Sequence, residues 1–218
     1  MRTYHRKKVV FVQLKDRAFN FLGDSITEGC RVSALDKIYH QLIAQQYGMR
    51  LARNYGVGGT CIAPHIGPGA HGPEFERRVE AMDRDADAVV VFGGTNDFGL
   101  GDAPFGTLDS EDKRTFCGAV HSLIAKLRSE FPTAEIVFMT PLHRLNEDIP
   151  SPRSGKTLAE YVEAERLICE RHGVPVIDLF SINPLDPADE SLLPDGLHPN
   201  DSGHVIMARV IAEELLKI

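Results

Sequence analysis

A serine lies in the segment Gly23-Asp24-Ser25-Ile26-Thr27, directly after the apolar stretch 18–22. A serine just beyond a strand, at the head of a helix, can present its oxygen as a nucleophile, and its own backbone N–H can face a developing oxyanion. The segment also suits a simple turn in which Asp24 or Ser25 caps a helix. It is not a G-x-S-x-G elbow, because Thr27 stands in place of the second glycine, and it lacks the G-K-[ST] of a phosphate-binding loop.

Two further segments could stabilise negative charge on a substrate oxygen. Asn54-Tyr55-Gly56-Val57-Gly58-Gly59-Thr60 holds three glycines, which let the backbone approach a ligand and offer bare N–H groups. It does not complete a dinucleotide-binding fingerprint, because Cys61 stands where the third glycine is required. Gly93-Gly94-Thr95-Asn96-Asp97 places the neutral amide of Asn96 just past a strand. There it suits an oxyanion donor or, taken alone, an Asx turn.

A carboxylate and an imidazole lie three residues apart in Leu193-Pro194-Asp195-Gly196-Leu197-His198-Pro199. In one tight turn the carboxylate of Asp195 can accept a hydrogen bond from Nδ1 of His198, which leaves Nε2 free to take a proton from a serine. The alternative is a metal-dependent hydrolase that adds His204, or histidines of the glycine-rich loop, as ligands. A lone D-x-x-H is weak evidence for a metal, so the spacing favours proton transfer.

These segments follow short apolar runs that are typical of strands. The candidate strands are 18–22, 51–54, 88–92, 135–139 and 175–178. Amphipathic stretches between them predict helices. We expect one over 35–47, with Leu35 on its apolar face and Gly48 at its end, a short one opened by Pro73, one capped by Ser110 that ends before Pro132, one from Leu158 that ends at Gly173, and one over 202–216.

Strand–helix alternation at this spacing predicts an α/β fold, a three-layer α/β/α sandwich around a parallel sheet. Ligands of such folds bind beyond the carboxyl ends of the strands. We expect one domain over 18–218, preceded by an extension over 1–17 in which 9–12 is a candidate additional strand.

Composition and charge exclude several classes of protein. The 218 residues are 43% hydrophobic and 25% charged, which is typical of a globular protein rather than a disordered one. The net charge is −7, and without a basic stripe we expect no nucleic-acid partner. No run is long and apolar enough to predict a membrane span or targeting segment, so the expected location is cytoplasmic. Four cysteines without a C-x-x-C spacing favour free thiols, with a Cys30–Cys61 pair as the alternative.

Taken together and in this order, the four blocks resemble the SGNH hydrolases, also called the GDSL esterase/lipase family. The matching residues are Gly23-Asp24-Ser25-Ile26-Thr27, Asn54-x-x-x-x-Gly59, Gly94-Thr95-Asn96-Asp97 and Asp195-x-x-His198. The resemblance covers 18–217. It implies a flavodoxin-like parallel five-stranded sheet in the order 2-1-3-4-5 and a catalytic triad of Ser25, His198 and Asp195. It also implies an oxyanion hole made by the backbone N–H groups of Ser25 and Gly59 and the side chain of Asn96.

Other polar residues are expected to support loops, to contact the substrate or to lie at the surface. Asp24, Thr27 and Asp97 are expected to support the loops that carry the reactive groups. Four side chains on loops near the predicted site are candidate substrate contacts: His65, His71, His143 and Arg144. The remaining histidines outside the Asp-His block and the metal alternative, His5, His40, His121 and His172, are expected at the surface.

The sequence and this resemblance together predict a serine esterase that cleaves small acyl groups, foremost acetyl, from oxygen esters, with a carbohydrate as one expected carrier. We expect it to need no cofactor and no metal. The expected partner is a small acyl-ester substrate, with no membrane and no nucleic acid, and a homo-oligomer is compatible with the sequence. The alternatives are a non-catalytic flavodoxin-like binding module and a longer-chain lipase or thioesterase of the same family.

Overall fold

The computed structural model describes residues 13–67 and 71–218. The candidate strand 9–12, and with it most of the predicted extension, lies outside the described residues, as does His5. None of the helices in the described part of the chain is both long and apolar enough to cross a bilayer.

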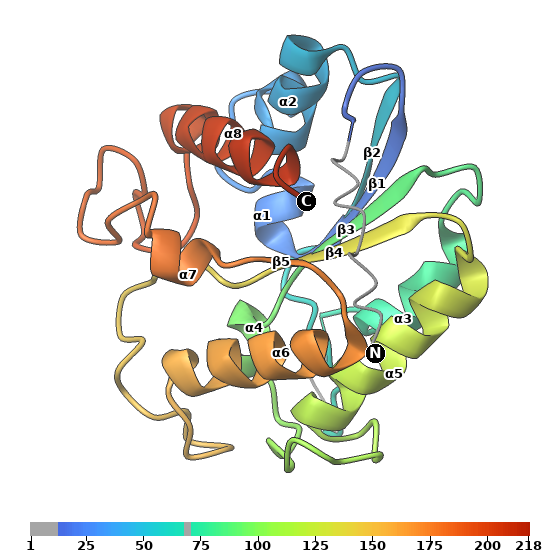
Figure 1. Ribbon diagram of the computed structural model, residues 1–218. Coiled ribbons are helices and arrows are strands. Elements are labelled where there is room, and N and C mark those ends of the chain that lie inside the picture. Colours follow the sequence, from blue (N-terminus) through green and yellow to red (C-terminus); the bar gives the residue numbers. More distant parts are fainter. Residues whose placement is uncertain (1–12, 68–70) are drawn as a thin grey trace, which may run out of the picture.

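Five parallel strands form one sheet in the order β2-β1-β3-β4-β5, which confirms the predicted topology (Figure 1). The strands are β1 (Ala18–Gly23), β2 (Leu51–Gly56), β3 (Ala88–Phe92), β4 (Glu135–Met139) and β5 (Val176–Ile177). Every residue of β1 and β3 is buried, as expected of central parallel strands covered on both faces.

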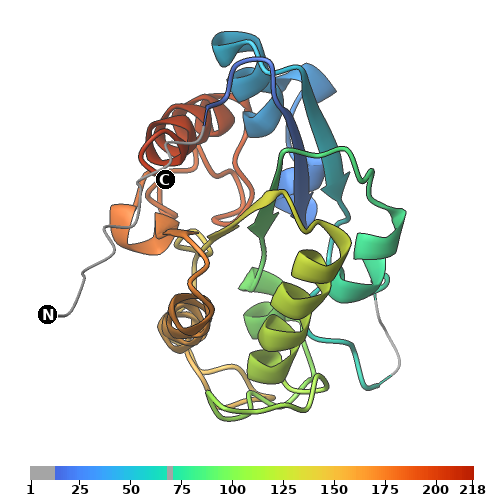
Figure 2. The same cartoon turned by 45° about the vertical axis from the view of Figure 1, so that its right-hand side comes forward.

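Helices cover both faces of the sheet and complete the predicted α/β/α sandwich (Figure 2). Alternate residues of β3 point to opposite faces: Val89 and Val91 join the core beneath α3 (Phe75–Arg78), α5 (Phe116–Glu130) and α6 (Leu158–His172). Val90 and Phe92 join the core beneath α1 (Ser25–Glu28), α2 (Tyr39–Tyr47), α7 (Leu179–Ile182) and α8 (Asp201–Leu215). The remaining elements are α4 (Thr95–Gly99) and the 3-10 turns η1 (Leu35–Lys37) and η2 (Val79–Ala81).

The predicted helix over 35–47 is divided in the structure. The turn η1 is separated from α2 by Ile38, whose backbone is extended with ψ 142°. Leu35, expected on the buried face, is 73% exposed. Gly48 does end α2, in the left-handed conformation with φ 67° that glycine adopts readily.

The helix predicted to start at Ser110 begins instead at Phe116. Thr115 is its cap, and its hydroxyl accepts the N–H of Gly118 at 3.2 Å. The hydroxyl of Ser110 hydrogen-bonds to that of Thr115 at 2.9 Å. The N–H of Phe116 donates to the carbonyl of Pro104, so a contact with the preceding loop decides which of the two hydroxyl residues opens the helix.

The other predicted helices form close to their expected bounds. A capping box of Thr157 and Glu160 opens α6, and Gly173 ends it with φ 61°. The side chain of Asn200 caps α8. Pro73 precedes the cap of α3 rather than occupying its first turn.

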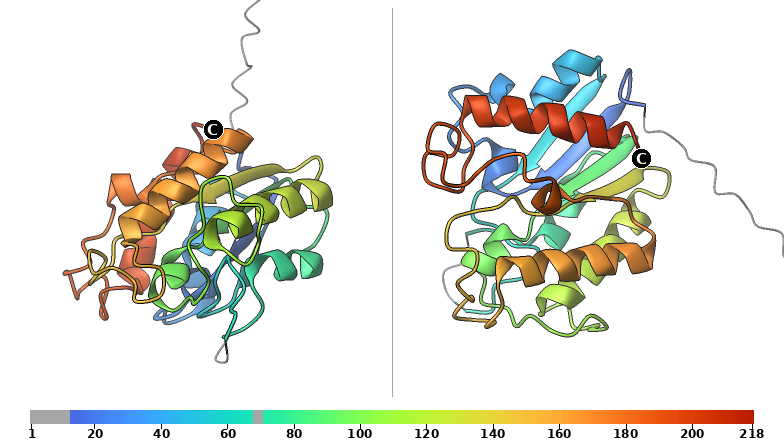
Figure 3. Two further views of the ribbon diagram at one scale, coloured as in Figure 1. Left: turned by 90° about the horizontal axis from the view of Figure 1, so that it is seen from below. Right: turned by 60° about the vertical axis from the view of Figure 1, so that its left-hand side comes forward.

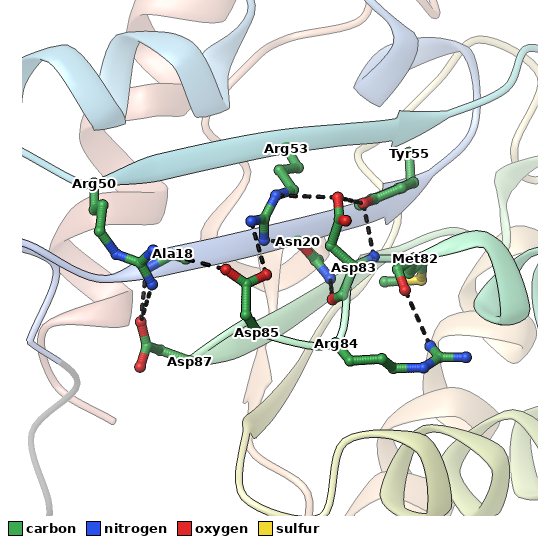
Figure 4. A network of polar contacts seen from close by, with 10 residues as sticks. All are labelled: Ala18, Asn20, Arg50, Arg53, Tyr55, Met82, Asp83, Arg84, Asp85 and Asp87. Atoms are coloured by element: carbon green, nitrogen blue, oxygen red, sulfur yellow. Dashed lines mark hydrogen bonds and ion pairs between the residues drawn. The ribbon is translucent and has the colours of Figure 1, made fainter.

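A polar network joins the edge strand β2 to the segment that leads into β3 (Figure 4). The guanidinium of Arg53 contacts Asp83 at 3.2 Å and Asp85 at 2.8 Å, and Arg50 contacts Asp85 at 3.7 Å. The hydroxyl of Tyr55 donates to Asp83 at 2.8 Å. These contacts tie the edge strand β2 to the segment before β3, across the intervening strand β1.

His40, expected at the surface, is fully buried in α2. Its ring stacks on Phe21 at a centroid distance of 5.0 Å, and its Nε2 lies 3.2 Å from the carbonyl of Thr27. Burial lowers the pKa of His40 to about 4. His121 and His172 are half-buried and contact each other at 2.7 Å between ring nitrogens. The sequence pattern did not distinguish these environments because they depend on residues from other elements.

Candidate active site

Ser25 is the first residue of α1 and follows β1 after the single residue Asp24. Asp24 caps this helix: its carboxylate accepts the N–H of Ile26 at 3.0 Å. Gly23 ends the strand where a Cβ would lie 2.1 Å from the Oγ1 of Thr27, so only glycine fits. As the first residue of a helix, Ser25 has a backbone N–H without an intrahelical partner. The turn therefore presents a hydroxyl and an N–H together.

The loop before α8 brings an imidazole to this hydroxyl. The Oγ of Ser25 lies 2.9 Å from Nε2 of His198, and Nδ1 of His198 lies 2.9 Å from a carboxylate oxygen of Asp195. A carboxylate can only accept, so Nδ1 carries the proton and Nε2 accepts from the serine. In the right-hand view of Figure 3 the loop between α7 and α8 lies beside α1. The three residues that the sequence singled out thus form one hydrogen-bonded chain.

The carboxylate of Asp195 is held in its ionised form. Partial burial opposes this, but the backbone N–H and the ring of His198 and the N–H of Leu197 donate to it and hold its pKa well below its usual range. An ionised carboxylate fixes the tautomer of His198 that can act as a base toward Ser25.

Two glycines of the loop after β2 compete for the role of oxyanion donor. The N–H of Gly58 donates to the carboxylate of Glu28 at 3.0 Å and is therefore occupied. Gly59 has φ 73°, and within residues 13–67 and 71–218 its N–H has no protein partner. A Cβ built on Gly58 would lie 3.6 Å from the Cβ of Ser25, so this loop packs directly against Ser25.

Asn96 lies at the start of α4, after Gly94 turns the chain with φ 99°. Its side chain is buried, and its Nδ2 donates one hydrogen to the carbonyl of Thr60 at 3.0 Å. The amide carries a second hydrogen, for which the described residues supply no acceptor. Asn96 is thereby anchored to the same loop that carries Gly59.

Two buried carboxyl groups hold these loops. Asp97 accepts the N–H groups of Ile62 and Ala63, both at 2.9 Å. Burial raises the pKa of Asp97 to about 7 despite these donors. Burial likewise raises the pKa of Asp24 to about 6, against the hydrogen bond from Ile26 and the nearby charge of His198. Thr27 is buried, and its hydroxyl meets that of Tyr39 at 3.1 Å.

The candidate substrate contacts on the loop after β2 differ in their surroundings. His71 is exposed and lies against Gly59, since a Cβ there would come 2.7 Å from the Cβ of His71. His65 is half-buried; its Nδ1 lies 3.4 Å from Asp102 and its Nε2 lies 3.6 Å from the Sγ of Cys61. The structure therefore leaves His71 more accessible than His65.

The candidates on the loop after β4 are tied to protein groups. The Nδ1 of His143 lies 2.6 Å from Glu147, and its ring packs on Phe180 at 3.8 Å. The guanidinium of Arg144 donates to the carbonyl and the hydroxyl of Thr95, both at 3.2 Å. Arg144 therefore binds the residue that directly precedes Asn96.

Several polar residues at the site were not predicted from the sequence. Arg78 is buried and donates to the carbonyls of Gly23 and Tyr55 and to the hydroxyl of Thr60, which joins the carboxyl ends of β1 and β2. Glu28 holds Gly58, as described above, and Arg31 contacts Asp195. Single arginines and glutamates outside a motif carry no spacing signal that would have marked them.

The alternative arrangements do not form. Cys30 and Cys61 are free thiols, and burial raises the pKa of Cys61 above its usual range. Both ring nitrogens of His198 are engaged, and Nδ1 of buried His204 accepts the N–H of Tyr39 at 3.1 Å. Across the described ranges, no three His, Cys, Asp or Glu side chains are grouped so that they could hold a metal ion.

A five-stranded parallel sheet with serine, glycine, asparagine and histidine blocks at its carboxyl edge is the arrangement of an SGNH-type hydrolase. The chain belongs to the GDSL-like lipase/acylhydrolase family, whose model matches residues 21–206. It is thus an ester-hydrolysing enzyme of that family.

Three known proteins illustrate the likeness. A GDSL lipase of Mycobacterium tuberculosis is 28% identical over 200 residues, which cover 88% of this chain and 78% of that protein. A solved crystal structure with 34% identity covers 94% of this chain and 98% of its own, with a TM-score of 0.83. An acetylxylan esterase from Geobacillus stearothermophilus, 21% identical, covers 94% and 96% with a TM-score of 0.61, and shares the fold.

Proposed function

We propose that this hydrolase is a serine esterase that removes small acyl groups, foremost acetyl, from oxygen esters on a polar carrier such as a sugar. The observation that carries the proposal is the hydrogen-bonded chain from Ser25 through His198 to Asp195, with both links at 2.9 Å. A serine hydroxyl is a weak nucleophile unless a base takes its proton, and this chain supplies the base and its orienting carboxylate.

The reaction follows from these contacts. The Oγ of Ser25 attacks the ester carbonyl while Nε2 of His198 takes its proton. The N–H groups of Ser25 and Gly59 and the amide of Asn96 donate to the oxyanion. His198 then protonates the departing alcohol, and a water that His198 deprotonates releases the acid from the acyl-serine. Asp195 stabilises the imidazolium in both halves of the reaction.

The tight packing around Ser25 supports a small acyl group. The backbone of Gly58 lies against the nucleophile, and buried Asp97 fixes Ile62 and Ala63 of the loop after β2. Polar side chains at the edge of the site, among them exposed His71, favour a polar alcohol.

The four cysteines are free thiols, which agrees with action in a reducing compartment, and we place the enzyme in the cytoplasm.

A longer acyl chain is the second candidate substrate, because aliphatic side chains are exposed on the loops after α4 and after β4. Leu100 after α4 is 50% exposed, and Leu145 and Ile149 after β4 are 47% and 62% exposed. Leu145 also touches the loop that carries His198, since its N–H donates to the carbonyl of Gly196 at 3.0 Å. Such side chains could bind a fatty chain at the rim of the site.

Chain-length dependence separates the two candidates. With a small-acyl site, kcat/KM for p-nitrophenyl esters should fall steeply from acetate through butyrate to octanoate. An apolar channel would instead gain about 0.8 kcal/mol, or about fourfold, for each methylene buried. A series that rises with length would reject the small-acyl proposal and leave the triad untouched. Leu145→Ser should then lower the octanoate rate and spare the acetate rate. Acetylated sugars measured beside p-nitrophenyl acetate would test the carrier.

A further inference from the structure

The segment after α1 follows the turn that carries Ser25 and contacts the loop that carries Asp195 and His198. The N–H groups of Gly29 and Cys30 both donate to the carbonyl of Ser25, at 3.1 and 2.9 Å. Arg31 follows with φ 71°, a left-handed conformation that disfavours residues with a Cβ. A non-glycine residue held in this conformation often has a functional reason.

The side chain of Arg31 crosses to the triad acid. Its Nε and a terminal guanidinium nitrogen both lie 3.2 Å from Oδ2 of Asp195. This is the same oxygen that accepts from Nδ1 of His198. Two residues on, the N–H and hydroxyl of Ser33 donate to Asp201 at the start of α8, at 2.8 and 2.5 Å. The segment is therefore fastened on both sides of His198.

This arrangement has two chemical consequences. The guanidinium fixes the carboxylate so that Oδ2 faces the imidazole. Its positive charge also lies close to the ring, where it repels the imidazolium form of His198 and partly offsets the attraction of Asp195. The side chain of Arg31 is 53% exposed, so salt should screen this repulsion.

Other charged groups face the same pair. Asp24, which caps α1, faces His198, and Arg144 of the loop after β4 faces Asp195. Burial raises the pKa of Asp24 to about 6, so the ionisation of this carboxyl also shapes the pH profile. A comparison between variants of Arg31 leaves these groups in place, so the difference between their profiles isolates the guanidinium.

We propose that Arg31 is a positioning residue of the triad, which orients Asp195 and keeps His198 unprotonated to lower pH. The inference rests on the proposed serine esterase function. It means that the acidic limb of hydrolysis, where His198 becomes protonated and can no longer act as a base, is set in part by a residue outside the triad.

The test compares the wild type with Arg31→Gln and Arg31→Lys. For p-nitrophenyl acetate, Arg31→Gln should move the acidic limb of kcat/KM to higher pH by about 0.3–1 unit, the size expected of a partly exposed charge. Arg31→Lys keeps the charge and should restore most of the shift. Raising the ionic strength from about 0.02 to 0.5 M should move the wild-type limb upward and move that of Arg31→Gln much less.

Arg166→Gln is the matched control, because Arg166 pairs with Glu163 in the same two-nitrogen fashion on α6. It should leave the limb in place. Titration of the His198 ring by NMR, assigned with His198→Asn, provides a readout that needs no turnover. Wild-type and Arg31→Gln titrations that coincide would overturn the role of Arg31. A wild type without hydrolysis but with the predicted NMR shift would overturn the esterase proposal alone.

Discussion

Ser25→Ala is expected to abolish ester hydrolysis, with a loss of about 10⁶-fold in kcat, because the residues of a triad act as a unit. The hydroxyl of Ser25 is the proposed site of the acyl intermediate, and removal of one oxygen should leave α1 and its Asp24 cap in place. The measurement is kcat and KM for p-nitrophenyl acetate, with circular dichroism to establish that the variant is folded.

Ser122→Ala is the matched control for this variant. Ser122 is on α5, where its hydroxyl donates to Glu76 at 2.7 Å in a partly buried contact. Its replacement therefore also removes one side-chain hydrogen bond, but no proposed catalytic group. It should retain the wild-type rate. A folded Ser25→Ala protein that keeps more than about a hundredth of the wild-type rate would show that another residue is the nucleophile.

Asn96→Ala is expected to lower kcat by about 10²–10³-fold with little change in KM, the effect typical of removing one oxyanion donor. The amide matters most when the carbonyl oxygen becomes negatively charged, so ground-state binding should change little. The variant also loses the hydrogen bond to the carbonyl of Thr60. A loss of stability in this variant must therefore be distinguished from a loss of kcat.

Asn20→Ala supplies that separation. Asn20 is also buried, and its Nδ2 donates to the carbonyl of Asp83 at 2.8 Å, within the network of Figure 4. Both variants should lose thermal stability, but only Asn96→Ala should lose kcat. A rise in KM with unchanged kcat for Asn96→Ala would instead make Asn96 a ground-state binding residue.

The sheet and most helices could be predicted because their signals are local. Apolar runs mark the strands, and Gly48 and Gly173 end helices where the left-handed conformation is required. The start of α5 could not be predicted, since Ser110 and Thr115 both suit a cap and a contact with Pro104 decides between them. Leu35 fits a helical period by sequence, but extended Ile38 separates it from α2.

Some residues of the candidate site could be predicted from the sequence, and others could not. Ser25, Asn96, Asp195 and His198 stand in short blocks that can be recognised one at a time, and the fold brings them to one edge of the sheet. Arg31 and Asp195 are 164 positions apart, and their contact exists only because α1 and the loop before α8 are neighbours in space. Buried His40 was misjudged for the same reason, because its ring is covered by Phe21 of β1.

The most direct test of Ser25 as the nucleophile is covalent labelling of the intact protein with a fluorophosphonate, followed by mass spectrometry to locate the adduct. Such reagents react with a serine whose oxygen is activated by a neighbouring base. We expect one adduct, on Ser25, that forms far more slowly in His198→Ala and is absent from Ser25→Ala. An adduct on a different residue, or equal labelling of wild type and Ser25→Ala, would contradict it.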